Sequence, residues 1–323
     1  MHQVLEWLGE FGVIPVVKIG QASDALPLGN ALIAGDLPVA EITFRTNAAE
    51  ESIRILADQC LNLLVGAGTV LTVEQARKAI AAGAKFIVAP GFNPKVVDFC
   101  IDEGVPVTPG VSTPTDIEKA LEKDLEVLKF FPAGSLGGLN YLKAIAAPYG
   151  GVQFIPTGGV EPGNLREYLS FDRVHAVGGT WVAPEKMISA KDFGGITRLA
   201  KEAVMLSLDF GLAHLGINPC GVDYGEAGAR QNAETMANLF SFALKDGTNS
   251  LFAGTAFEFL KNRGAGINGH IAISTLSVPR AIAFLQRRGV EVMPETAKER
   301  DGRIIAVNLK LGIADFAVHL LQK

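Results

Sequence analysis

Residues 63–92, LLVGAGTVLTVEQARKAIAAGAKFIVAPGF, contain one complete unit of strand, helix and strand. The apolar run 63–71 predicts a buried strand, and Thr72 supplies a side-chain cap for the helical spacing that follows. Gly83 then ends the helix, because glycine readily takes the left-handed conformation that a helix C-terminus favours. The next apolar run, 84–92, predicts a second strand.

The same alternation extends in both directions along the first two thirds of the chain. Further apolar runs are GVIPVVKIG (12–20), VAEITFRTN (39–47), VPVTPGVST (105–113), LEVLKFFPAG (125–134), VQFIPTGGV (152–160) and VHAVGGTWV (174–182). About eight strand–helix units predict a closed (β/α)8 TIM barrel. A doubly wound open sheet is the alternative, but it usually has fewer strands and a GxGxxG turn after the first one, which this sequence lacks. We therefore expect an α/β barrel over residues 1–208.

The pattern changes beyond the helical segment that ends near Leu208. From Ala213 the sequence predicts a strand (213–218), a helix (226–244) and short strands, and the same order begins again at GHIAIS (269–274). This duplicated βαβββ pattern is too short for another barrel. We expect a smaller α+β domain of paired βαβββ modules over residues 213–323.

Composition excludes several classes of protein. With 48% hydrophobic and 20% charged residues, the chain can bury large cores and is not of the disordered type. A net charge of −5 provides no basic field for nucleic acid or for an anionic membrane. An anionic substrate must therefore be held by local groups, and we expect a small-molecule substrate. No apolar run reaches the ~18 residues that a membrane span needs.

The cysteines and the N-terminal residues indicate the cellular compartment in which the protein is expected. Cys60, Cys100 and Cys220 lie far apart and form no CxxC pair, so a disulfide framework or zinc knot is not expected and a reducing compartment fits. The start, MHQVLEWLGEFGVIP, lacks the basic region and small-residue cleavage site of a signal peptide. We expect a cytoplasmic protein.

Charged residues interrupt one predicted barrel strand. In VAEITFRTN, the period of two places Glu41, Thr43 and Arg45 on one face, and Ile42 and Phe44 on the other. The apolar face suits the surrounding helices, so the charged face points into the barrel, where an acid and a base are costly unless paired or used. A structural Glu–Arg pair is the alternative. Arg45 favours function, since it stands at the strand's C-terminal end, where barrel enzymes carry their active sites.

Lys129 is the strongest candidate for a reactive side chain. It lies within LEVLKFFPAG between apolar residues, and apolar surroundings with another cation nearby lower the pKa of a lysine. A partly neutral lysine is a nucleophile towards ketones. A lysine that extends its ammonium to solvent at a strand edge is the alternative. Thr69 also lies at a strand end, where a threonine is more often a helix cap.

Two glycine pairs end the last two predicted barrel strands. Gly158-Gly159 follows one strand and Gly178-Gly179 lies at the other, where barrels commonly hold phosphate on backbone N–H groups. One such pair also serves plain turns. Two pairs at these two positions favour a phosphate site.

Together these stretches resemble one family, the 2-keto-3-deoxy-6-phosphogluconate (KDPG) / 4-hydroxy-2-oxoglutarate (KHG) aldolases. These are class I aldolases on a (β/α)8 barrel. The matching stretches, in order, are EITFRT, VGAGTVL, FIVAPGFNP, TPGVSTPT, LKFFPAG, PTGGV and GGTWV, and they cover essentially residues 1–205.

The resemblance implies a role for each matching residue. Lys129 is implied to be the Schiff-base lysine, and Glu41 the proton shuttle. Arg45 and Thr69 are implied to hold the pyruvyl unit. The implied pocket wall and phosphate end comprise Pro90, Phe131, Thr157, Gly158, Gly159, Gly179 and Thr180. Thr180 stands where many members carry serine, and it keeps the hydroxyl. The family also implies a homotrimer, and a reaction that needs no cofactor because the iminium accepts the electrons.

The second domain resembles the glyoxalase / vicinal-oxygen-chelate modules, which often hold a divalent metal with His and Glu from the first and last strands of each half. The corresponding candidates here are His214, Glu258, His270 and His319, of which His319 stands where a second Glu is commoner. Three nitrogens and one oxygen suit zinc, nickel or iron. Histidines on half-buried strands that are merely hydrogen-bonded are the alternative.

Three functions follow from these observations. The first is an aldolase with a passive or regulatory appendage. The second is a bifunctional enzyme whose second domain adds metal-dependent isomerase, lyase or dioxygenase chemistry. The third, a binding protein on a decayed barrel, is disfavoured because the set Glu41, Arg45, Thr69 and Lys129 is intact.

Overall fold

The computed structural model describes residues 1–219 and 225–323, so Cys220 lies outside the described residues. The chain divides into two compact units, Met1–Ser207 and Leu208–Lys323, and each is described by itself. Of the cysteines within the described residues, Cys60 and Cys100 are buried and free. Among the same residues, no helix combines the length and the apolar composition that a membrane crossing requires.

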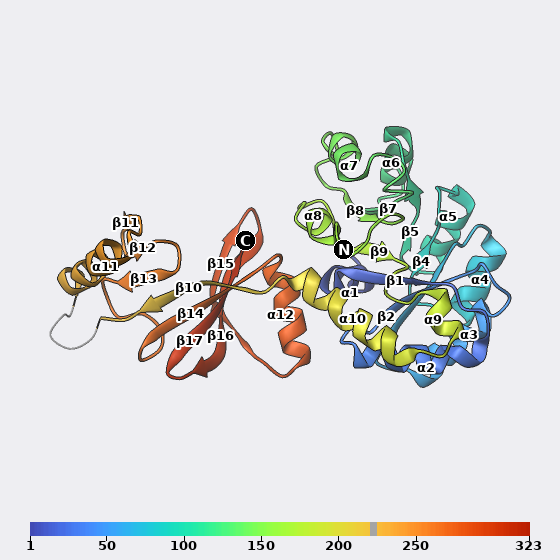
Figure 1. The fold of residues 1–323 in the computed structure, drawn as a ribbon. Coiled ribbons are helices and arrows are strands. Elements are labelled where there is room, and N and C mark those ends of the chain that lie inside the picture. Colours follow the sequence, from blue (N-terminus) through green and yellow to red (C-terminus); the bar gives the residue numbers. More distant parts are fainter. Residues whose placement is uncertain (220–224) are drawn as a thin grey trace. The chain divides into compact units, whose positions relative to one another are not determined.

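The first unit is a barrel of short parallel strands (Figure 1). The strands are β1 (Val13–Val17), β2 (Val39–Thr43), β3 (Leu64–Gly68), β4 (Ile87–Val88), β5 (Val107–Thr108), β6 (Gly110–Val111), β7 (Val127–Phe130), β8 (Gln153–Pro156) and β9 (Val177–Gly179). They pair in the orders β5-β4-β3-β2-β1-β9 and β6-β7-β8. Single bridges, Phe154 with Val174 and Thr157 with Gly178, join β8 to the β9 side.

The predicted fifth strand is the one that departs from regular pairing. Pro109 separates β5 from β6, because proline has no N–H to donate to a ladder. Counting β5 and β6 as one interrupted strand leaves the eight strands that the sequence predicts. The prediction of a TIM barrel followed by a smaller α+β domain is confirmed.

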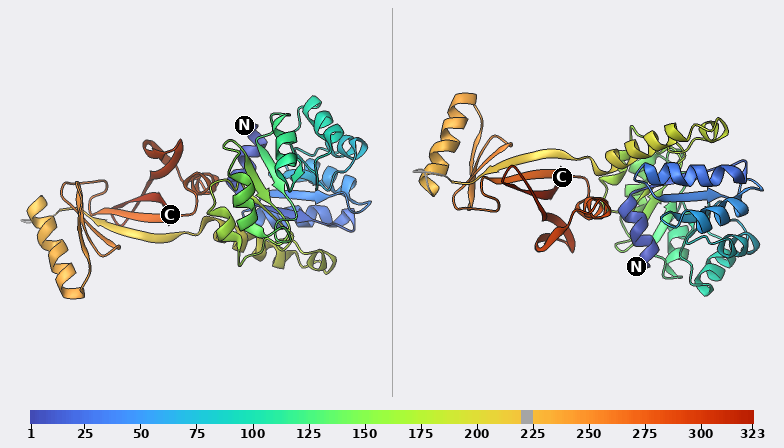
Figure 2. Two further views of the ribbon diagram at one scale, coloured as in Figure 1. Left: turned by 90° about the horizontal axis from the view of Figure 1, so that it is seen from above. Right: turned by 90° about the horizontal axis from the view of Figure 1, so that it is seen from below.

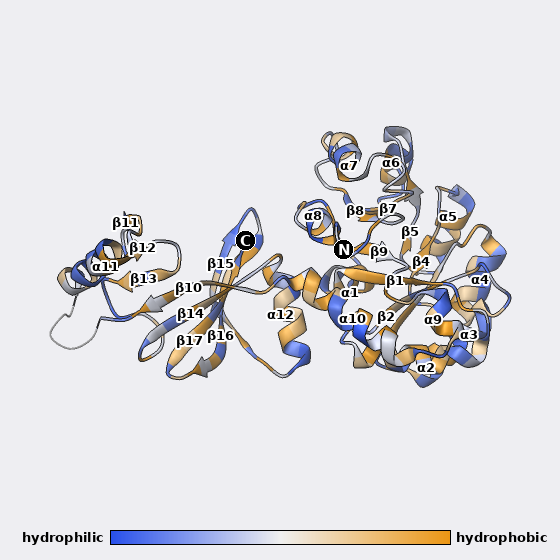
Figure 3. Ribbon diagram, in the orientation of Figure 1, coloured by the Kyte–Doolittle hydropathy of each residue, from blue (hydrophilic) through white to orange (hydrophobic). Residues whose placement is uncertain are grey.

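Helices surround these strands, as the views in Figure 2 show. They are α1 (Gln3–Phe11), α2 (Ala25–Ala34), α3 (Ala49–Gln59), α4 (Val73–Ala81), α5 (Pro94–Asp102), α6 (Pro114–Leu121), α7 (Gly138–Ala146), α8 (Leu165–Leu169), α9 (Glu185–Ser189) and α10 (Phe193–Leu208), with a 3-10 turn at Ala22–Asp24. The side chains of Thr72, Asn93 and Thr113 cap α4, α5 and α6. Every residue of β1, β2 and β3 is buried, and Figure 3 shows β1 mainly in the hydrophobic colour.

The second unit is one mixed eight-stranded sheet made of two similar halves. The first half contains β10 (Gly211–Ile217), α11 (Glu226–Phe240), β11 (Leu244–Asp246), β12 (Ser250–Ala253) and β13 (Phe257–Leu260). The second contains β14 (Gly269–Thr275), α12 (Val278–Arg287), β15 (Val292–Arg300), β16 (Arg303–Ile313) and β17 (Phe316–Gln322). Each half therefore has the order strand, helix and three strands.

The order of strands in this sheet is symmetric about its centre. It runs β11-β12-β13-β10-β14-β17-β16-β15, so the first strands of the two halves, β10 and β14, pair antiparallel in the middle. The last strand of each half lies parallel to its first strand, as β13 with β10 and β17 with β14. The four central strands are thus the first and last strands of the two halves.

Candidate functional site

Lys129 and Glu41 meet inside the barrel. Lys129 extends from β7 and Glu41 from β2, and Nζ lies 3.2 Å from Oε1. Only 4% of Lys129 and 3% of Glu41 is exposed, so neither charge is solvated as it would be at the surface. Lys129 Nζ also lies 5.6 Å from the centre of the Phe131 ring. An amine that is buried beside one carboxylate and one aromatic face has a proton acceptor within reach and little competing water.

A glycine on the neighbouring strand makes room for Glu41. Gly68 ends β3 and is the register partner of Thr43 on β2, so it faces the barrel interior beside the glutamate. A Cβ at Gly68 would overlap Oε1 of Glu41. Gly68, the second glycine of GAGTVL, is therefore required by the position of the Glu41 carboxylate. The sequence alone did not reveal this role of Gly68.

Arg45 and Thr69 are linked at the mouth of the barrel. Arg45 Nε donates a hydrogen bond to Thr69 Oγ1 over 3.1 Å. The sequence pattern predicted Arg45 within the inward row of its strand, and this detail is wrong: β2 ends at Thr43, and Arg45 lies exposed in the turn beyond it. The backbone turns there because Arg45 N donates to Thr43 O over 2.8 Å. The guanidinium is consequently available at the mouth, the end of the strand at which the sequence predicted it.

The predicted phosphate end is a group of backbone segments at the same ends of β8 and β9. Gly158 and Gly159 have φ values of 86° and 82°, in the left-handed region that favours glycine. Thr157 is buried and bridges Gly178, where a Cβ would collide with the threonine hydroxyl. Gly179 ends β9 and Thr180 is exposed beyond it. The side chains of Phe131, Thr157 and Trp181 occupy the space that a Cβ would need at Gly158, Gly178 and Gly179, so the chain at these strand ends leaves room only for glycine.

The remaining predicted wall residues follow strands of the barrel. Pro90 lies just beyond β4 and Phe131 just beyond β7, and both are half-buried. The carboxyl ends of β2, β3, β4, β7, β8 and β9 thus carry the predicted barrel-site residues above Lys129 and Glu41. This is the end of the barrel at which such folds build active sites.

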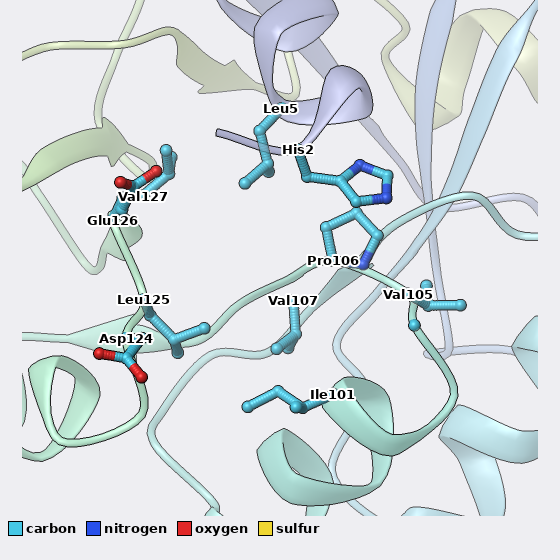
Figure 4. Close-up of a pocket in the computed structure, with 11 residues that line it drawn as sticks. His2, Leu5, Ile101, Val105, Pro106, Val107, Asp124, Leu125, Glu126 and Val127 are labelled. Atoms are coloured by element: carbon cyan, nitrogen blue, oxygen red, sulfur yellow. The ribbon is translucent and has the colours of Figure 1, made fainter.

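A separate cavity opens at the opposite end of the barrel (Figure 4). Its volume is about 240 Å³, and it lies between α1 and the segments that lead into β5 and β7. Leu5, Ile101 and Val107 are among its apolar lining residues, with Asp124 and Glu126 beside them. None of the predicted site residues lines it, so it is not the catalytic mouth.

Four side chains predicted as metal ligands meet on the second unit's sheet. His214, Glu258, His270 and His319 extend from β10, β13, β14 and β17, the four central strands. Glu258 Oε2 lies 3.2 Å from His214 Nε2 and 3.0 Å from His270 Nε2, and the two Nε2 atoms are 3.1 Å apart. Nitrogens of the three histidines lie within 4.8 Å of one another.

These four residues occupy the sheet face opposite the helices. Helix α11 packs with Ile217, Leu251 and Phe259, so the alternate residues of the same strands face away from it. In the other half, Val318 is buried on the strand that contacts α12, and His319 is the next residue. We call the face that carries His214, Glu258, His270 and His319 the histidine face.

The strand register relates the two halves of this cluster. The central pair is Leu215 with Ile271, and His214 and His270 immediately precede these two residues. Glu258 is the register partner of Gly216, and His319 is the partner of Ala272, the corresponding position in the other half. The two central histidines are therefore equivalent by position, and His319 is the equivalent of Glu258.

The electrostatics of the cluster suit a cation. Burial opposes ionisation of Glu258, but hydrogen bonds with His214, His270 and Ser250 outweigh it and hold its pKa well below the usual range. Ser250 Oγ donates to Glu258 Oε1 over 2.6 Å. Burial and the two neighbouring histidines lower the pKa of His319 to about 4. At neutral pH the carboxylate is ionised and the His319 ring is neutral, which are the forms that bind metals.

Two residues that support the cluster were missed by sequence reasoning. Gly216 lies opposite His270, and a Cβ there would overlap the imidazole ring. Ser250 holds the second oxygen of Glu258. Neither residue has a motif of its own, because both act across strands whose register is not visible in the sequence.

Comparison with known proteins places the first unit. The family model described as KDPG and KHG aldolase matches residues 4–199. The 2-dehydro-3-deoxy-phosphogluconate aldolase of Treponema pallidum is 48% identical over 206 residues, which cover 64% of this chain and 98% of the relative. The KHG/KDPG aldolase of Escherichia coli K12 is 39% identical over 192 residues, which cover 59% of this chain and 90% of the relative.

Solved structures agree with these sequence matches. One is a KDPG aldolase from Legionella pneumophila in which pyruvate was captured as a covalent carbinolamine intermediate. It superimposes with a TM-score of 0.61 at 37% identity, covering 62% of this chain and 98% of that one. A KDPG aldolase of Zymomonas mobilis ZM4 with 3-phosphoglycerate gives a TM-score of 0.59 at 37% identity, covering 62% of this chain and 95% of that one.

Proposed function

Because the chain belongs to the KDPG and KHG aldolase family, we propose that its barrel cleaves 2-keto-3-deoxy-6-phosphogluconate to pyruvate and glyceraldehyde 3-phosphate through a Schiff base on Lys129. The smaller substrate 4-hydroxy-2-oxoglutarate would give pyruvate and glyoxylate at the same site. The observation that carries this proposal is the buried contact of 3.2 Å between Lys129 Nζ and Glu41 Oε1. It would join a nucleophile to a proton carrier inside the buried core of the barrel.

The chemistry follows from this contact. The Lys129 amine adds to the C2 ketone, and loss of water from the carbinolamine gives an iminium. The C3–C4 bond then breaks, its electrons move into the iminium to form an enamine, and Glu41 takes the proton of the C4 hydroxyl. Protonation at C3 and hydrolysis release pyruvate and free the lysine. Since the iminium accepts the electrons, the barrel reaction needs no metal.

We propose that the substrate binds at the barrel mouth, at the carboxyl ends of the strands. Arg45 would pair with the carboxylate beside C2, and Thr69, which accepts a hydrogen bond from Arg45, would orient the guanidinium and the pyruvyl unit. The wall is assigned to Pro90 and Phe131. The phosphate would lie against the backbone at Thr157, Gly158, Gly159, Gly179 and Thr180, and the positive φ values of Gly158 and Gly159 support a tight turn of the chain around an anion there.

Reductive trapping tests the nucleophile. The full chain is incubated with pyruvate and borohydride, digested and measured by mass spectrometry. We expect one reduced pyruvyl group on the peptide that contains Lys129 and none in Lys129→Ala. Lys143→Ala is the matched control, because Lys143 lies on α7 outside the barrel interior, and it should retain the label. A label on Lys18 or Lys143 in the native chain would overturn the mechanism.

A second candidate function belongs to the C-terminal unit. We propose that His214, Glu258, His270 and His319 hold one divalent ion, of zinc, nickel or iron, and that the protein is bifunctional. The ion would supply Lewis-acid chemistry, while Ser250 and Gly216 keep the ligands in position. Support comes from the convergence of these four residues from four strands. A regulatory domain that binds its ligand without turnover is the alternative.

Metal analysis tests this second proposal. We expect one equivalent of zinc, nickel or iron per chain by elemental mass spectrometry, and loss of most of it in His270→Ala. A native chain that retains no such ion after exposure to each metal would contradict the proposal. We also propose a homotrimer, on the resemblance to the aldolase family, and analytical ultracentrifugation of the full chain measures it.

A further inference from the structure

The two flanks of the histidine face differ in chemistry. Phe252 on β12 is the register partner of Glu258, and Asn308 on β16 is the partner of His319. These two positions are equivalent in the two halves, because their partners are equivalent. Phe252 contacts the His214 ring edge-on, with ring centres 5.5 Å apart. One flank of the cluster is therefore aromatic, and the other is an amide.

Lys298 adds a positive charge to the amide flank. It is the register partner of Ala306 on β16, two residues before Asn308, so both side chains stand on the histidine face. Strand β16, with which Lys298 pairs, also pairs with β17, the strand that carries His319. Lys298 is exposed, and within the described part of the chain it has no carboxylate as an ion-pair partner.

Lys310, on β16, provides a comparison with Lys298, because its charge has an ion-pair partner. Lys310 Nζ lies 2.8 Å from Oε2 of Glu291, the residue directly before β15, so its charge has a carboxylate partner beside it. By contrast, if the cluster held the proposed divalent ion, three neutral imidazoles, one carboxylate and the ion would sum to one positive charge, to which Lys298 would add another. In that state, the excess charge of the histidine face would be positive, and Lys298 would place part of it on the polar flank.

We infer that the C-terminal unit binds a small carboxylate at this centre, with the carboxylate on the side of Lys298 and Asn308 and the apolar end of the ligand towards Phe252. The inference rests on the metal centre proposed above. A carboxylate neutralises the excess charge, accepts from the ammonium and the amide, and shares the cation with Glu258. Short 2-oxo acids fit this description, and pyruvate is the one that the proposed barrel reaction releases.

Cobalt(II) in place of the native ion provides a readout that does not depend on activity. The full chain is loaded with one equivalent of cobalt(II), and pyruvate is titrated while the visible d–d bands are followed. Pyruvate bound only at Lys129 leaves these bands unchanged, because the barrel holds no cobalt. We expect pyruvate to shift the bands, and neutral hydroxyacetone at the same concentration to leave them unchanged.

Substitutions at Lys298 and Asn308 then test whether the polar flank binds the carboxylate. Lys298→Ala should raise the Kd for pyruvate about tenfold, since one charge-assisted hydrogen bond is lost, and Lys298→Arg should keep it within about threefold. Asn308→Asp should weaken binding further by placing a like charge beside the carboxylate. Lys310→Ala is the matched control and should leave the Kd unchanged. Cobalt content is measured in every variant.

The outcomes separate the two proposals. If cobalt(II) does not bind at one equivalent, or binds equally in His270→Ala, the metal centre itself is wrong. If cobalt(II) binds as expected but pyruvate leaves the bands unchanged, the carboxylate site is wrong and the metal centre stands. Equal pyruvate affinities in the native chain and Lys298→Ala would likewise remove the polar flank from the site.

Discussion

The barrel mouth and the histidine face place charged residues on strands in two different ways. In the barrel, Lys129 and Glu41 are buried together, and the proposed reactive group belongs to a single lysine. On the histidine face, four half-buried side chains converge, and none of them is a nucleophile of that kind. In the proposed functions, the first arrangement would carry its own chemistry, whereas the second would need an ion before it could act. Buried charge on a strand therefore indicates a site but does not indicate the type of chemistry.

The two sites nevertheless share one structural device. A glycine on the neighbouring strand leaves the space that a functional side chain occupies, Gly68 for Glu41 and Gly216 for His270. In both cases the overlapping atoms would belong to the far end of a side chain, which can move aside. Substitution of either glycine should displace the functional group more than it destabilises the fold.

The largest expected effect is on proton transfer in the barrel. Glu41→Gln should lower kcat by about 10²–10⁴-fold, because the amide keeps the shape but cannot accept the C4 proton. Stopped assays of pyruvate release measure it, with thermal unfolding as the control for stability. Unchanged turnover would reduce Glu41 to the structural partner of Lys129.

Gly68→Ala should have the next largest effect. The added Cβ moves the Glu41 carboxylate, and a displacement of about 1 Å at a catalytic group costs roughly 10²-fold in rate. Metal content of the second unit should be unaffected, which makes the histidine face the internal control. A variant with native kcat would show that Glu41 tolerates displacement and that its position is not critical.

Gly216→Ala is the counterpart on the histidine face. Its Cβ would push the His270 ring aside, and losses of about 10–100-fold in metal affinity are typical when ligand orientation is disturbed. Competition with a chromogenic chelator measures the affinity, and aldolase turnover should stay within about twofold. Native affinity would mean that His270 is not a ligand.

Gly158→Ala tests the phosphate end. At φ 86° an alanine costs about 1–2 kcal/mol, and relief of that strain would withdraw the backbone N–H from a phosphate. We expect kcat/KM to fall about 5–30-fold for the phosphorylated substrate and much less for 4-hydroxy-2-oxoglutarate. Equal losses on both substrates would indicate a general distortion of the mouth.

The smallest expected effect is that of a chelator on the barrel. Removal of metal from the full chain should leave aldolase kcat/KM unchanged, because the iminium, not an ion, accepts the electrons. The assay is run before and after dialysis against a chelator, with residual metal measured. A loss that is restored by adding the ion back would show that the barrel reaction depends on the second unit.

Local patterns in the sequence predicted much of this structure. The caps at Thr72 and Thr113 and the strand around Lys129 follow from residues close together in the chain, and the structure has them where the patterns place them. The early end of β2 before Arg45 was not predicted, because an alternating pattern does not show where pairing stops. The roles of Gly68, Gly216 and Ser250 were not predicted either, since each acts through a cross-strand neighbour.

The central β10–β14 pair has a consequence for the cooperativity of unfolding. His214 and Glu258 belong to one half of the sheet, and His270 and His319 to the other. An ion held by all four is a cross-link between halves that otherwise meet along this strand pair. Its binding energy then opposes separation of the halves, by about 2.7 kcal/mol when the free ion is at a hundred times its Kd. With the proposed ion bound in this way, the melting temperature of the second unit would measure the free ion concentration around it.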